Sequence, residues 1–304
     1  MSARVRKAAV SPSPRPVRRG VAVRIAFATC SAIPDGWDDD HDVAKLLHAE
    51  YQVWDDPAVN WSAYDRVLLR SVWDYSERLP EFLKWCRSVG QSRLRNQPAM
   101  VAYNADKRYL AELSAPCVPT RYLQPGESLS SIDTDVVIKP NISAGARDTG
   151  RFTSPAAAAD LIAKIHASGR IALAQPYLPG VEERGETSVV FIGGEFSHAL
   201  KKRAILREDG VAPVIDGPLR VAAALLEDDL VLRGTADAAE MRLAVSVHQE
   251  ITARFGVPTY ARVDVIADSE GQPVLSELEL IEPALHLRHA RGASERLAIA
   301  MRNS

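Results

Sequence analysis

Four charged residues near the C-terminal end of the chain could support metal and phosphate chemistry together. Arg262 and Asp264 lie in one run of alternating β-branched residues, Glu277 and Glu279 lie in a second, and the segment between them is rich in Asp, Ser and Gly. This pattern is typical of a β-hairpin. If residues 270–271 form the turn, Asp264 faces Glu277, Arg262 faces Glu279, and all four side chains share one face of the sheet.

Three carboxylates on one face repel one another at the roughly 5 Å spacing of directly opposed residues. They therefore favour a bound cation, and Mg²⁺ takes oxygen ligands from one or two carboxylates together with substrate phosphates. We interpret Asp264, Glu277 and Glu279 as a candidate Mg²⁺ site. The alternative is the solvated face of an ordinary hairpin, and a one-residue change of register would move Asp264 to the other face.

Two lysines and a loop of small residues precede this hairpin. Lys107 lies in a predicted helix over residues 104–113 with Asn104 as its N-cap, and Lys139 ends a predicted buried strand. The following loop, residues 141–151, is small, polar and rich in Gly. Its backbone amides can approach phosphate oxygens, and a nearby lysine adds positive charge. The loop matches neither the P-loop nor the GxGxxG pattern, so an ordinary surface loop is the alternative.

A second hairpin is predicted around Gly193 and Gly194. With these glycines at the turn, Glu186 faces Lys201. In a cleft this pair could hold a ribose hydroxyl and a phosphate, whereas at an exposed surface it would contribute little. Residues 203–235 lack clear periodicity, and we interpret them as a long loop that could cover a site.

The N-terminal part of the chain alternates short strands with helices. Strands are predicted to begin at Val23, Tyr51 and Arg66, and an amphipathic helix covers residues 80–89. Such alternation indicates a small parallel α/β domain. Polar residues follow the third strand at its carboxyl end, where open α/β sheets bind ligands. The candidate substrate contacts there are Arg70, Ser71 and Asp74.

Composition limits the partners of the protein. The 304 residues, 46% of them hydrophobic, are enough for two or three domains with a sizeable core. Residues 1–22 contain six basic residues, no acidic residue and several prolines, so we predict a disordered basic leader, solvated rather than bound to an anionic partner. The remainder holds 31 basic and 39 acidic residues, and nothing in it indicates a nucleic-acid surface.

Cysteine usage and the distribution of apolar residues indicate the cellular compartment. Cys30, Cys86 and Cys117 are odd in number and widely spaced, which fits buried thiols in a reducing cytoplasm better than disulfides or zinc ligands. The sequence contains no run of about 18 apolar residues, so we expect no membrane span. It also has no apolar segment near the N-terminus of the kind that a secretory signal needs. We therefore expect a cytoplasmic protein that binds neither membranes nor nucleic acids.

The order of these features resembles the ATP-grasp superfamily over residues 23–304. The series is a helix lysine, a strand lysine with a small-residue loop, a strand ending in Gln-Pro-Tyr-Leu, a Glu/Lys hairpin, and a hairpin with Arg-x-Asp and Glu-x-Glu. The resemblance implies a fold of mixed α/β and α+β class, with an N-terminal pre-ATP-grasp parallel α/β domain. The implied divisions are the leader at 1–22, the pre-ATP-grasp domain at 23–103, the central lid subdomain at 104–175 and the C-terminal subdomain with the metal site at 176–304.

The resemblance also implies where ATP binds. Lys107 and Lys139 look like the two phosphate-contacting lysines of the family. Glu186, or Glu183 if a gap is placed differently, looks like the acid that binds the ribose. A flexible loop over the phosphates and a hinge that meets adenine would supply the other contacts. These are Ser143, Ala144 and Gly145 in the loop, and Gln175, Tyr177 and Leu178 in the hinge.

Catalytic roles follow from the same resemblance. Lys201 and Arg262 are similar to basic residues near the γ-phosphate and the acyl phosphate, and Arg147 on the loop could assist when the lid closes. Phosphoryl transfer depends on positioning and charge neutralisation, so no covalent Ser or Cys intermediate is expected. Many family members carry Asn at the position of Glu279, which is a departure in this chain. The residues that look like the family's Mg²⁺ ligands are Asp264, Glu277 and Glu279.

Several phrases resemble more closely the cycloserine-synthetase group of actinobacterial ATP-grasp enzymes. Among them are LRSVWDY at 69–75, SAGARDTG at 143–150 and LELIEP at 278–283. This resemblance implies an ATP- and Mg²⁺-dependent carboxylate-amine ligase or cyclase of antibiotic biosynthesis. Its amino-acid-like substrate would be an O-ureido-serine or a relative, closed through an acyl phosphate to cycloserine or a related ring. The alternatives are an intermolecular amino-acid or peptide ligase and a non-catalytic ATP-binding regulatory protein, and a homodimer is left open.

Overall fold

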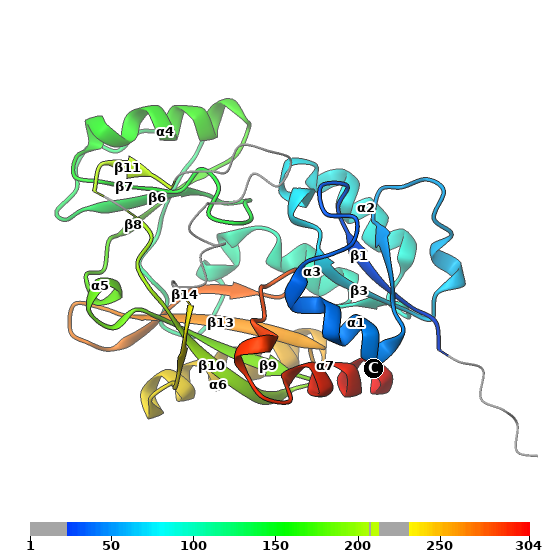
Figure 1. Ribbon diagram of the computed structural model, residues 1–304. Helices are drawn as coiled ribbons and strands as arrows, with labels where there is room; N and C mark the ends of the chain where they lie inside the picture. Colours follow the sequence, from blue (N-terminus) through cyan, green and yellow to red (C-terminus); the bar gives the residue numbers. More distant parts are fainter. Residues whose placement is uncertain (1–22, 207, 213–230) are drawn as a thin grey trace, which may run out of the picture.

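The computed structural model of the protein describes residues 23–206, 208–212 and 231–304. Within these ranges the strands form one parallel sheet of four strands and two antiparallel sheets of five strands each. Figure 1 shows the parallel sheet beside one antiparallel sheet, with the other antiparallel sheet above. The predicted leader at residues 1–22 lies outside the described residues.

The N-terminal sheet is entirely parallel, as the alternation of strands and helices predicts. One face carries Ala26, Ala28 and Leu69 into a core with Trp54 and Phe82. The opposite face is also apolar, as expected of a parallel sheet covered on both sides. From one edge to the other its strands are β2 (Glu50–Val53), β1 (Ile25–Thr29), β3 (Arg66–Ser71) and β4 (Leu94–Arg95), and its helical segments are η1 (Asp38–Asp40), α1 (His41–Leu47), η2 (Trp61–Ala63), η3 (Trp73–Glu77) and α2 (Leu79–Val89).

The larger antiparallel sheet, which we call the β13 sheet, is apolar on one face, whereas the other face is polar around Asp264 and apolar around Val190 and Tyr260. Val263 and Val265 point toward one long helix and pack with Val247 and Ile251. This helix begins at a capping box in which Asp237 accepts hydrogen bonds from backbone amides of the first turn. From one edge to the other the strands are β12 (Val231–Gly234), β10 (Glu195–Lys202), β9 (Glu186–Ile192), β13 (Tyr260–Ala267) and β14 (Pro273–Glu279), and the helix is α6 (Ala238–Phe255).

The second antiparallel sheet, which we call the β6 sheet, packs one helix against a separate core. Ile138 and Phe152 meet Leu161 and Ile165 there. A serine caps the start of this helix: the Ser154 hydroxyl accepts a hydrogen bond from the first turn, and proline occupies the next position. From one edge to the other the strands are β11 (Gly210–Val211), β7 (Gly150–Phe152), β6 (Val136–Pro140), β8 (Ala172–Pro176) and β5 (Arg121–Leu123), with helices α4 (Pro155–Ala167) and α5 (Gly180–Arg184).

The predicted helix over residues 104–113 is wrong in its boundaries. The chain forms α3 (Pro98–Asn104) and then a 3₁₀ segment, η4 (Lys107–Ala111), which is capped by Asp106. Asn104 therefore ends one helix and does not cap the next. Its side-chain amide donates to Leu278 O and accepts from Leu280 N, both at 2.8 Å, because β14 is an edge strand whose outer backbone groups need partners.

The long loop predicted at residues 203–235 contains two short strands. β11 pairs with β7 in the β6 sheet, and β12 pairs with β10 in the β13 sheet. The chain between β10 and β11 therefore crosses from one antiparallel sheet to the other. Residue 207 and residues 213–230 lie outside the described residues, so the prediction for them stays a prediction.

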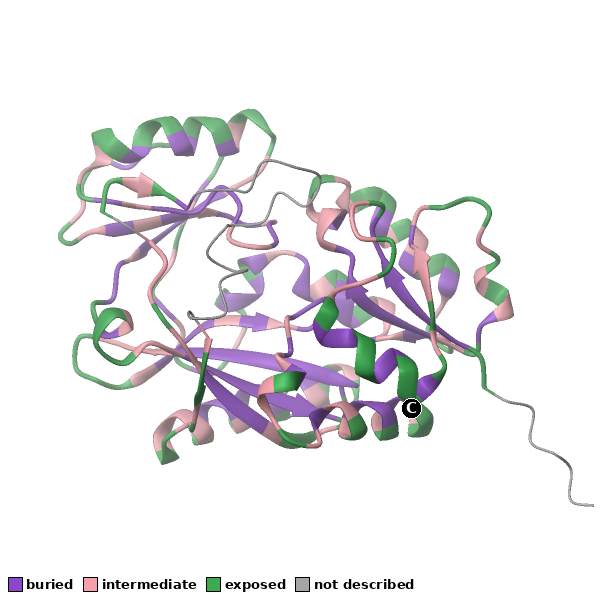
Figure 2. Ribbon diagram, viewed as in Figure 1, coloured by how far each residue is buried: buried purple, intermediate pink, exposed green. Residues whose placement is uncertain are grey.

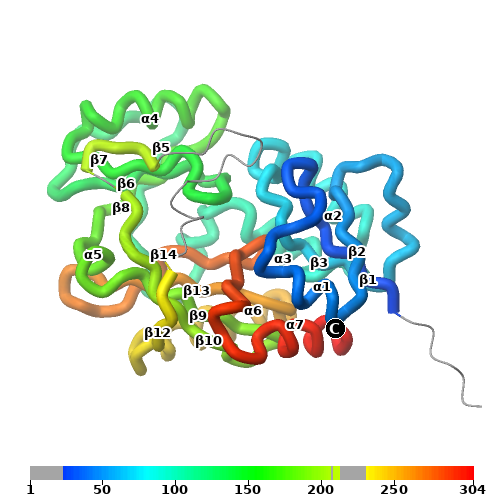
Figure 3. Tube along the Cα trace, in the orientation of Figure 1, coloured from blue at the N-terminus to red at the C-terminus, as the bar shows by residue number. Residues whose placement is uncertain are grey.

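The N-terminal domain and the β13 sheet share a core. Phe27 and Leu68 pack with Val190 and Tyr260, and the last helix, α7 (Ala293–Asn303), lies against α1. The 3₁₀ segment η7 (Leu287–His289) precedes it. The Tyr260 hydroxyl makes hydrogen bonds to the carbonyls of Leu69 and Ile281. Figure 2 shows that strands of both sheets in this part are buried, and Figure 3 shows α7 beside α1 along the same chain trace. In the part of the chain that the structure describes, no helix is long and apolar enough to cross a membrane.

Candidate active site

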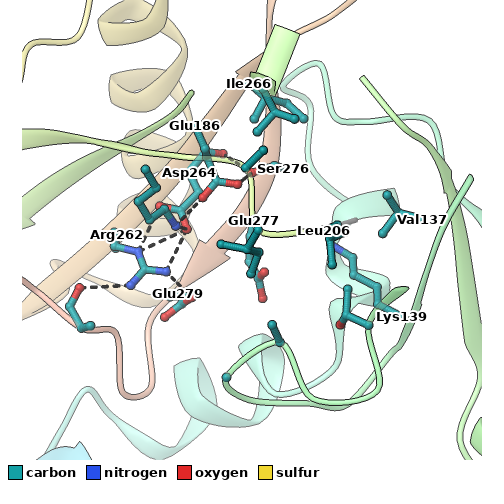
Figure 4. Close-up of a pocket in the computed structure, with 18 of the residues that line it drawn as sticks. Val137, Lys139, Glu186, Leu206, Arg262, Asp264, Ile266, Ser276, Glu277 and Glu279 are labelled. Atoms are coloured by element: carbon teal, nitrogen blue, oxygen red, sulfur yellow. Dashed lines mark hydrogen bonds and ion pairs between the residues drawn. The ribbon is translucent and has the colours of Figure 1, made fainter. Parts of the chain in front are cut away.

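A cavity of about 340 Å³ lies between the two antiparallel sheets. Lys139 of β6 lies on one side, and Arg262, Asp264, Glu277 and Glu279 of the β13–β14 hairpin lie across from it (Figure 4). Strands place these side chains together because alternate residues of a strand point to the same face. The odd-numbered neighbours of Arg262 and Asp264 are apolar and pack on α6, so charge is confined to the cavity side.

The predicted pairing of the hairpin is confirmed, but its turn is not where the sequence places it. Asp264 faces Glu277 and Arg262 faces Glu279. Ser276 forms a bulge, after which Val265 faces Leu275, and the connection covers residues 268–272. A bulge adds one unpaired residue to a strand and changes the register beyond it. The error in the position of the turn and the unpredicted bulge shift the register in opposite directions. The pairing of the charged residues is therefore the predicted one.

Arg262 and Asp264 form the centre of a buried ion-pair network. The Arg262 guanidinium donates to both carboxylate oxygens of Asp264 at 2.9–3.2 Å and also contacts Glu279. Lys202 Nζ lies 2.8 Å from Asp264 Oδ2, and the Ser188 hydroxyl donates to Oδ1 at 2.7 Å. Burial alone would raise the pKa of Asp264, but Arg262 and Lys202 hold it well below its ordinary value.

The two glutamates differ in their partners. Lys107 Nζ lies 3.3 Å from Glu277 and also donates to the carbonyl and hydroxyl of Ser143 at 2.9 and 3.0 Å. Although burial opposes it, Lys107 and then Lys139 lower the pKa of Glu277. Burial raises the pKa of Glu279 to about 7, against the attraction of Arg262 and with the repulsion of Glu277. Lys107 thus links the small-residue loop to the hairpin.

Lys139 is the cation on the opposite wall. Among the described residues its side chain makes no hydrogen bond or ion pair, and burial lowers its pKa. Its ammonium group is therefore available to a ligand with negative charge.

Lys201 does not face Glu186, contrary to the sequence prediction. Phe196 faces Phe191, the pairing that glycines 193 and 194 at the turn would give, but a bulge at Ser197 shifts the remaining pairs, so Lys202 faces Glu186. Because neighbouring residues of a strand point to opposite faces, this shift puts Lys202 in the cavity. Lys201 lies on the other face, where it contacts Thr187 and lies 2.9 Å from Glu240 of α6.

The carboxylates of the hairpin suit a hard divalent cation by their oxygen chemistry. In the described ranges no group of three or more His, Cys, Asp or Glu side chains is placed so that it could hold a metal ion. Asp264 is only 1% exposed and is engaged by Arg262 and Lys202, whereas Glu277 and Glu279 open onto the cavity. The donor set therefore fits Mg²⁺ through Glu277 and Glu279, with Asp264 available only if its ion pairs rearrange.

Most predicted nucleotide contacts line the cavity, although their roles remain predictions. Ala144 lines a smaller adjoining cavity instead. Glu183 is exposed on α5 and is not among the lining residues, so the choice between Glu186 and Glu183 favours Glu186. The predicted contacts that line the large cavity are Lys107, Lys139, Ser143, Gly145, Gln175, Tyr177, Leu178 and Glu186.

Arg147 lies on the predicted loop but is not among the residues that line the large cavity. Its side chain is buried, and Nη1 lies 2.7 Å from Glu77 Oε1 of the N-terminal domain. The flanking residues Ala146 and Asp148 both have positive φ, at 53° and 55°, so the backbone reverses around it. The structure therefore gives Arg147 a contact between the loop and the N-terminal domain.

The three substrate candidates of the N-terminal domain do not line either cavity. Arg70 is buried and bonds to Asp40 at 2.8 Å, the Ser71 hydroxyl accepts from the Trp37 amide, and Asp74 accepts from Trp54 Nε1 at 2.9 Å. The carboxyl end of β3 thus holds neighbouring segments of the N-terminal domain in place, and contact of these three residues with a substrate stays a prediction. The same segment does reach the cavities through two other residues, Trp73 and Tyr75.

Several cavity residues are not predicted from the sequence. Residues 203–206 line the cavity because the chain crosses between the two sheets there. Glu282 lines both cavities, and burial followed by the repulsion of Glu279 raises its pKa to about 8. Its position in the run LELIEP gives the only sequence signal. His286 has a φ of 51°, and burial, Arg262 and Lys202 lower its pKa to about 2.

Comparisons with known proteins show the family to which the chain belongs. The family model described as the N-terminal domain of D-cycloserine synthetase DcsG matches residues 25–96. The chain is 33% identical over 289 residues to the cycloserine biosynthesis protein DcsG of Streptomyces lavendulae, covering 86% of this chain and 93% of that protein. It is also similar to a crystal structure of D-cycloserine synthetase DcsG, with a TM-score of 0.77, 28% identity, and coverage of 92% of this chain and 98% of that one.

Two more distant structures share the fold. One is the D-alanine–D-alanine ligase of Bacillus anthracis complexed with ATP, with a TM-score of 0.61, 13% identity and coverage of 93% and 96% of the two chains. The other is a RimK domain ATP-grasp protein of Sphaerobacter thermophilus, with a TM-score of 0.59, 15% identity and coverage of 91% and 98%. The predicted ATP-grasp architecture is therefore confirmed.

Proposed function

Because the chain belongs to the cycloserine-synthetase group of the ATP-grasp ligases, we propose that it uses ATP and Mg²⁺ to close an amino-acid derivative, an O-ureido-serine, to a cyclic isoxazolidinone. The observation that carries the proposal is the convergence of Lys107, Lys139, Lys202 and Arg262 on a cavity that also holds the hairpin carboxylates. A site of this kind suits phosphoryl transfer, because the reaction is catalysed mainly by positioning the reactants and neutralising their negative charge.

ATP would lie between the two antiparallel sheets. The segment after β8, with Tyr177 and Leu178, supplies an apolar wall for the base, and Glu186 supplies an acceptor for the ribose hydroxyls. The loop that contains Ser143 and Gly145 offers backbone amides to the phosphates. Lys139 has no protein partner among the described residues, which supports a phosphate contact for it.

The reaction would proceed in two steps. The substrate carboxylate attacks the γ-phosphorus of ATP, and the bond from this phosphorus to the bridging oxygen breaks. The products of this step are ADP and an acyl phosphate. The ureido nitrogen bonded to oxygen then attacks the acyl carbon, the C–O bond to phosphate breaks, the nitrogen loses its proton to solvent or a base, and inorganic phosphate leaves. The ring nitrogen of this isoxazolidinone still carries the carbamoyl group, and its hydrolysis by water would be needed to give cycloserine. Lys202 and Arg262 are held toward the cavity by Asp264, and we assign them the stabilisation of the developing oxyanion.

Mg²⁺, when bound, would neutralise charge between the β- and γ-phosphates. Glu277 and Glu279 are the accessible donors, with Asp264 beside them. The double variant Asp264→Asn with Glu277→Gln is expected to lose Mg²⁺-dependent ADP release. Turnover that survives this change would remove both residues from the metal site.

A cytoplasmic location is part of the proposal. The three cysteines are free thiols, two of them buried, which is consistent with a reducing compartment.

The test is incubation of the protein with ATP, Mg²⁺ and O-ureido-serine, followed by measurement of ADP, phosphate and product mass. A cyclase forms its product from this one substrate. A product that appears only when a second amine is added would indicate an intermolecular ligase. Tight ATP binding without ADP release across a wide panel of amino-acid derivatives would indicate a non-catalytic ATP-binding protein and overturn the proposal.

A further inference from the structure

The carboxylates of the large cavity differ in whether the protein supplies a cation for them. Asp264 has Arg262 and Lys202, Glu277 has Lys107, and Glu279 has Arg262. Each of these negative charges is therefore compensated within the chain.

Glu282 lacks such a partner. It is only 9% exposed, and among the described residues its carboxylate makes no ion pair and no hydrogen bond to another residue. A buried carboxylate without a cation is costly, and sites of this kind are commonly completed by a ligand. The carboxylate lines both the large cavity and the smaller one beside it.

The smaller cavity has a volume of about 40 Å³. It shares Lys107, Ser143, Glu277 and Glu279 with the large cavity, so the two are adjoining parts of one site. A water molecule needs about 10–15 Å³ of such space, so the cavity has room for the amine end of a small amino acid and not for a nucleotide. Tyr75, from the segment in which the sequence predicts substrate contacts, forms its N-terminal wall.

We propose that Glu282 binds the α-ammonium group of the substrate in this smaller cavity and thereby selects amino acids over other carboxylic acids. The inference rests on the proposed function for the identity of the substrate. A substrate placed this way directs its carboxylate toward the cations of the large cavity, because the ammonium and carboxylate groups of an α-amino acid are joined through a single carbon. The charges of the ligand and of the site are then complementary at both ends.

The test compares two probes by titration calorimetry with the full chain loaded with ADP and Mg²⁺. The probes are O-ureido-serine and its analogue without the α-amino group, 3-(ureidooxy)propanoate. The wild-type protein is expected to bind O-ureido-serine at least about tenfold more tightly, as a charge-assisted hydrogen bond allows. In Glu282→Gln the ratio of the two dissociation constants should fall to within about twofold, and Glu282→Asp, which keeps the charge, should restore part of it.

The matched control is Glu270→Gln, the same change at an exposed position in the β13–β14 connection. It should leave the ratio unchanged. No preference for the amino probe in the wild type, or an equal preference in Glu282→Gln, would overturn the inference even if cyclic product forms. A preference that depends on Glu282 without any ADP release would instead support the inference and overturn the proposed function.

Discussion

One extra residue decides which of two adjacent lysines reaches the cavity. The bulge at Ser197 leaves Phe196 opposite Phe191 but brings Lys202, and not Lys201, opposite Glu186. Ser197 is held in place by a hydrogen bond from Arg296 of α7 at 2.9 Å. A contact with a distant helix therefore determines the identity of a charged residue in the site.

Exchanging the two lysines separately tests this assignment. Lys202→Met should lower kcat/KM by about 10²–10³, because the variant loses a cation directed at the reacting phosphoryl and acyl groups. Lys201→Met loses an ion pair with Glu240 on the opposite face, which should cost about 1 kcal/mol or less and leave kcat/KM within a few fold. Steady-state ADP release measures both. Equal losses in the two variants would contradict the assignment.

Because the carboxyl group of Glu282 is buried, we expect the stability of the protein to depend on pH. Burial and Glu279 raise its pKa to about 8, whereas in the unfolded chain it ionises near pH 4.3. Between these values the folded protein holds a proton that the unfolded chain has released, so this group lowers stability as the pH rises toward 8. Glu282→Gln removes the effect. Its Tm should match that of the wild type at pH 5 and exceed it by about 2 °C or more at pH 8, measured without ligands. Parallel Tm curves for the two proteins would count against a buried, uncompensated carboxylate.

At the scale of elements, the positions of Glu277 and Glu279 depend on the hydrogen-bond partners that the chain supplies to the outer backbone groups of β14. β14 is the outer strand of the β13 sheet, and its free backbone groups would be unsatisfied in the interior. Asn104 supplies two of the missing partners. The Tyr109 hydroxyl supplies a third, since it accepts from Leu278 N at 2.8 Å, and it also donates to Leu278 O at 2.9 Å. Leu278 lies between Glu277 and Glu279, so these bonds hold both glutamates in place.

Two tyrosines provide a matched test of this edge. Tyr109→Phe leaves the amide of Leu278 unpaired, while its carbonyl keeps the hydrogen bond from Asn104, and should lower the free energy of unfolding by about 1–3 kcal/mol. Tyr103→Phe removes a buried hydroxyl that has no hydrogen-bond partner, so stability should be unchanged or slightly higher. Urea unfolding measures both. A loss in Tyr103→Phe as large as that in Tyr109→Phe would show that the bonds to β14 are not the cause.

The sequence is informative where local chemistry decides the structure. Ser154 and the proline that follows predict the start of α4, and the alternation of apolar and charged residues predicts the β13–β14 pairing. The sequence is uninformative where contacts between residues far apart along the chain determine the local structure. The bulges at Ser197 and Ser276, the boundary at Asn104 and the ion pair of Arg70 with Asp40 all depend on partners far along the chain. Register and side-chain partners are therefore the features that local patterns miss.

At the scale of the molecule, the hydrophobic cores define two parts. The core of the β6 sheet contains only residues between Leu123 and Ala174. The other cores combine segments, since Ile281 packs in the core of the N-terminal domain and Val190 packs with Phe27. The parallel sheet and the β13 sheet thus form one unit, and the cavity lies between this unit and the β6 sheet. Domain closure about such a cavity is a common way to exclude water during transfer.

Closure predicts a localised change in hydrogen exchange. A non-hydrolysable ATP analogue with Mg²⁺ should slow exchange of the amides in residues 143–149 by at least about tenfold, because they would be held against phosphate. Amides of β9 and β13, which are already buried, should change little. Lys139→Met should abolish the protection, because the cation on the β6 sheet is lost, while Lys201→Met should retain it, since Lys201 lies on the far face of the β13 sheet. Protection confined to the β13 sheet, or protection that persists in Lys139→Met, would show that the nucleotide binds without engaging the β6 sheet.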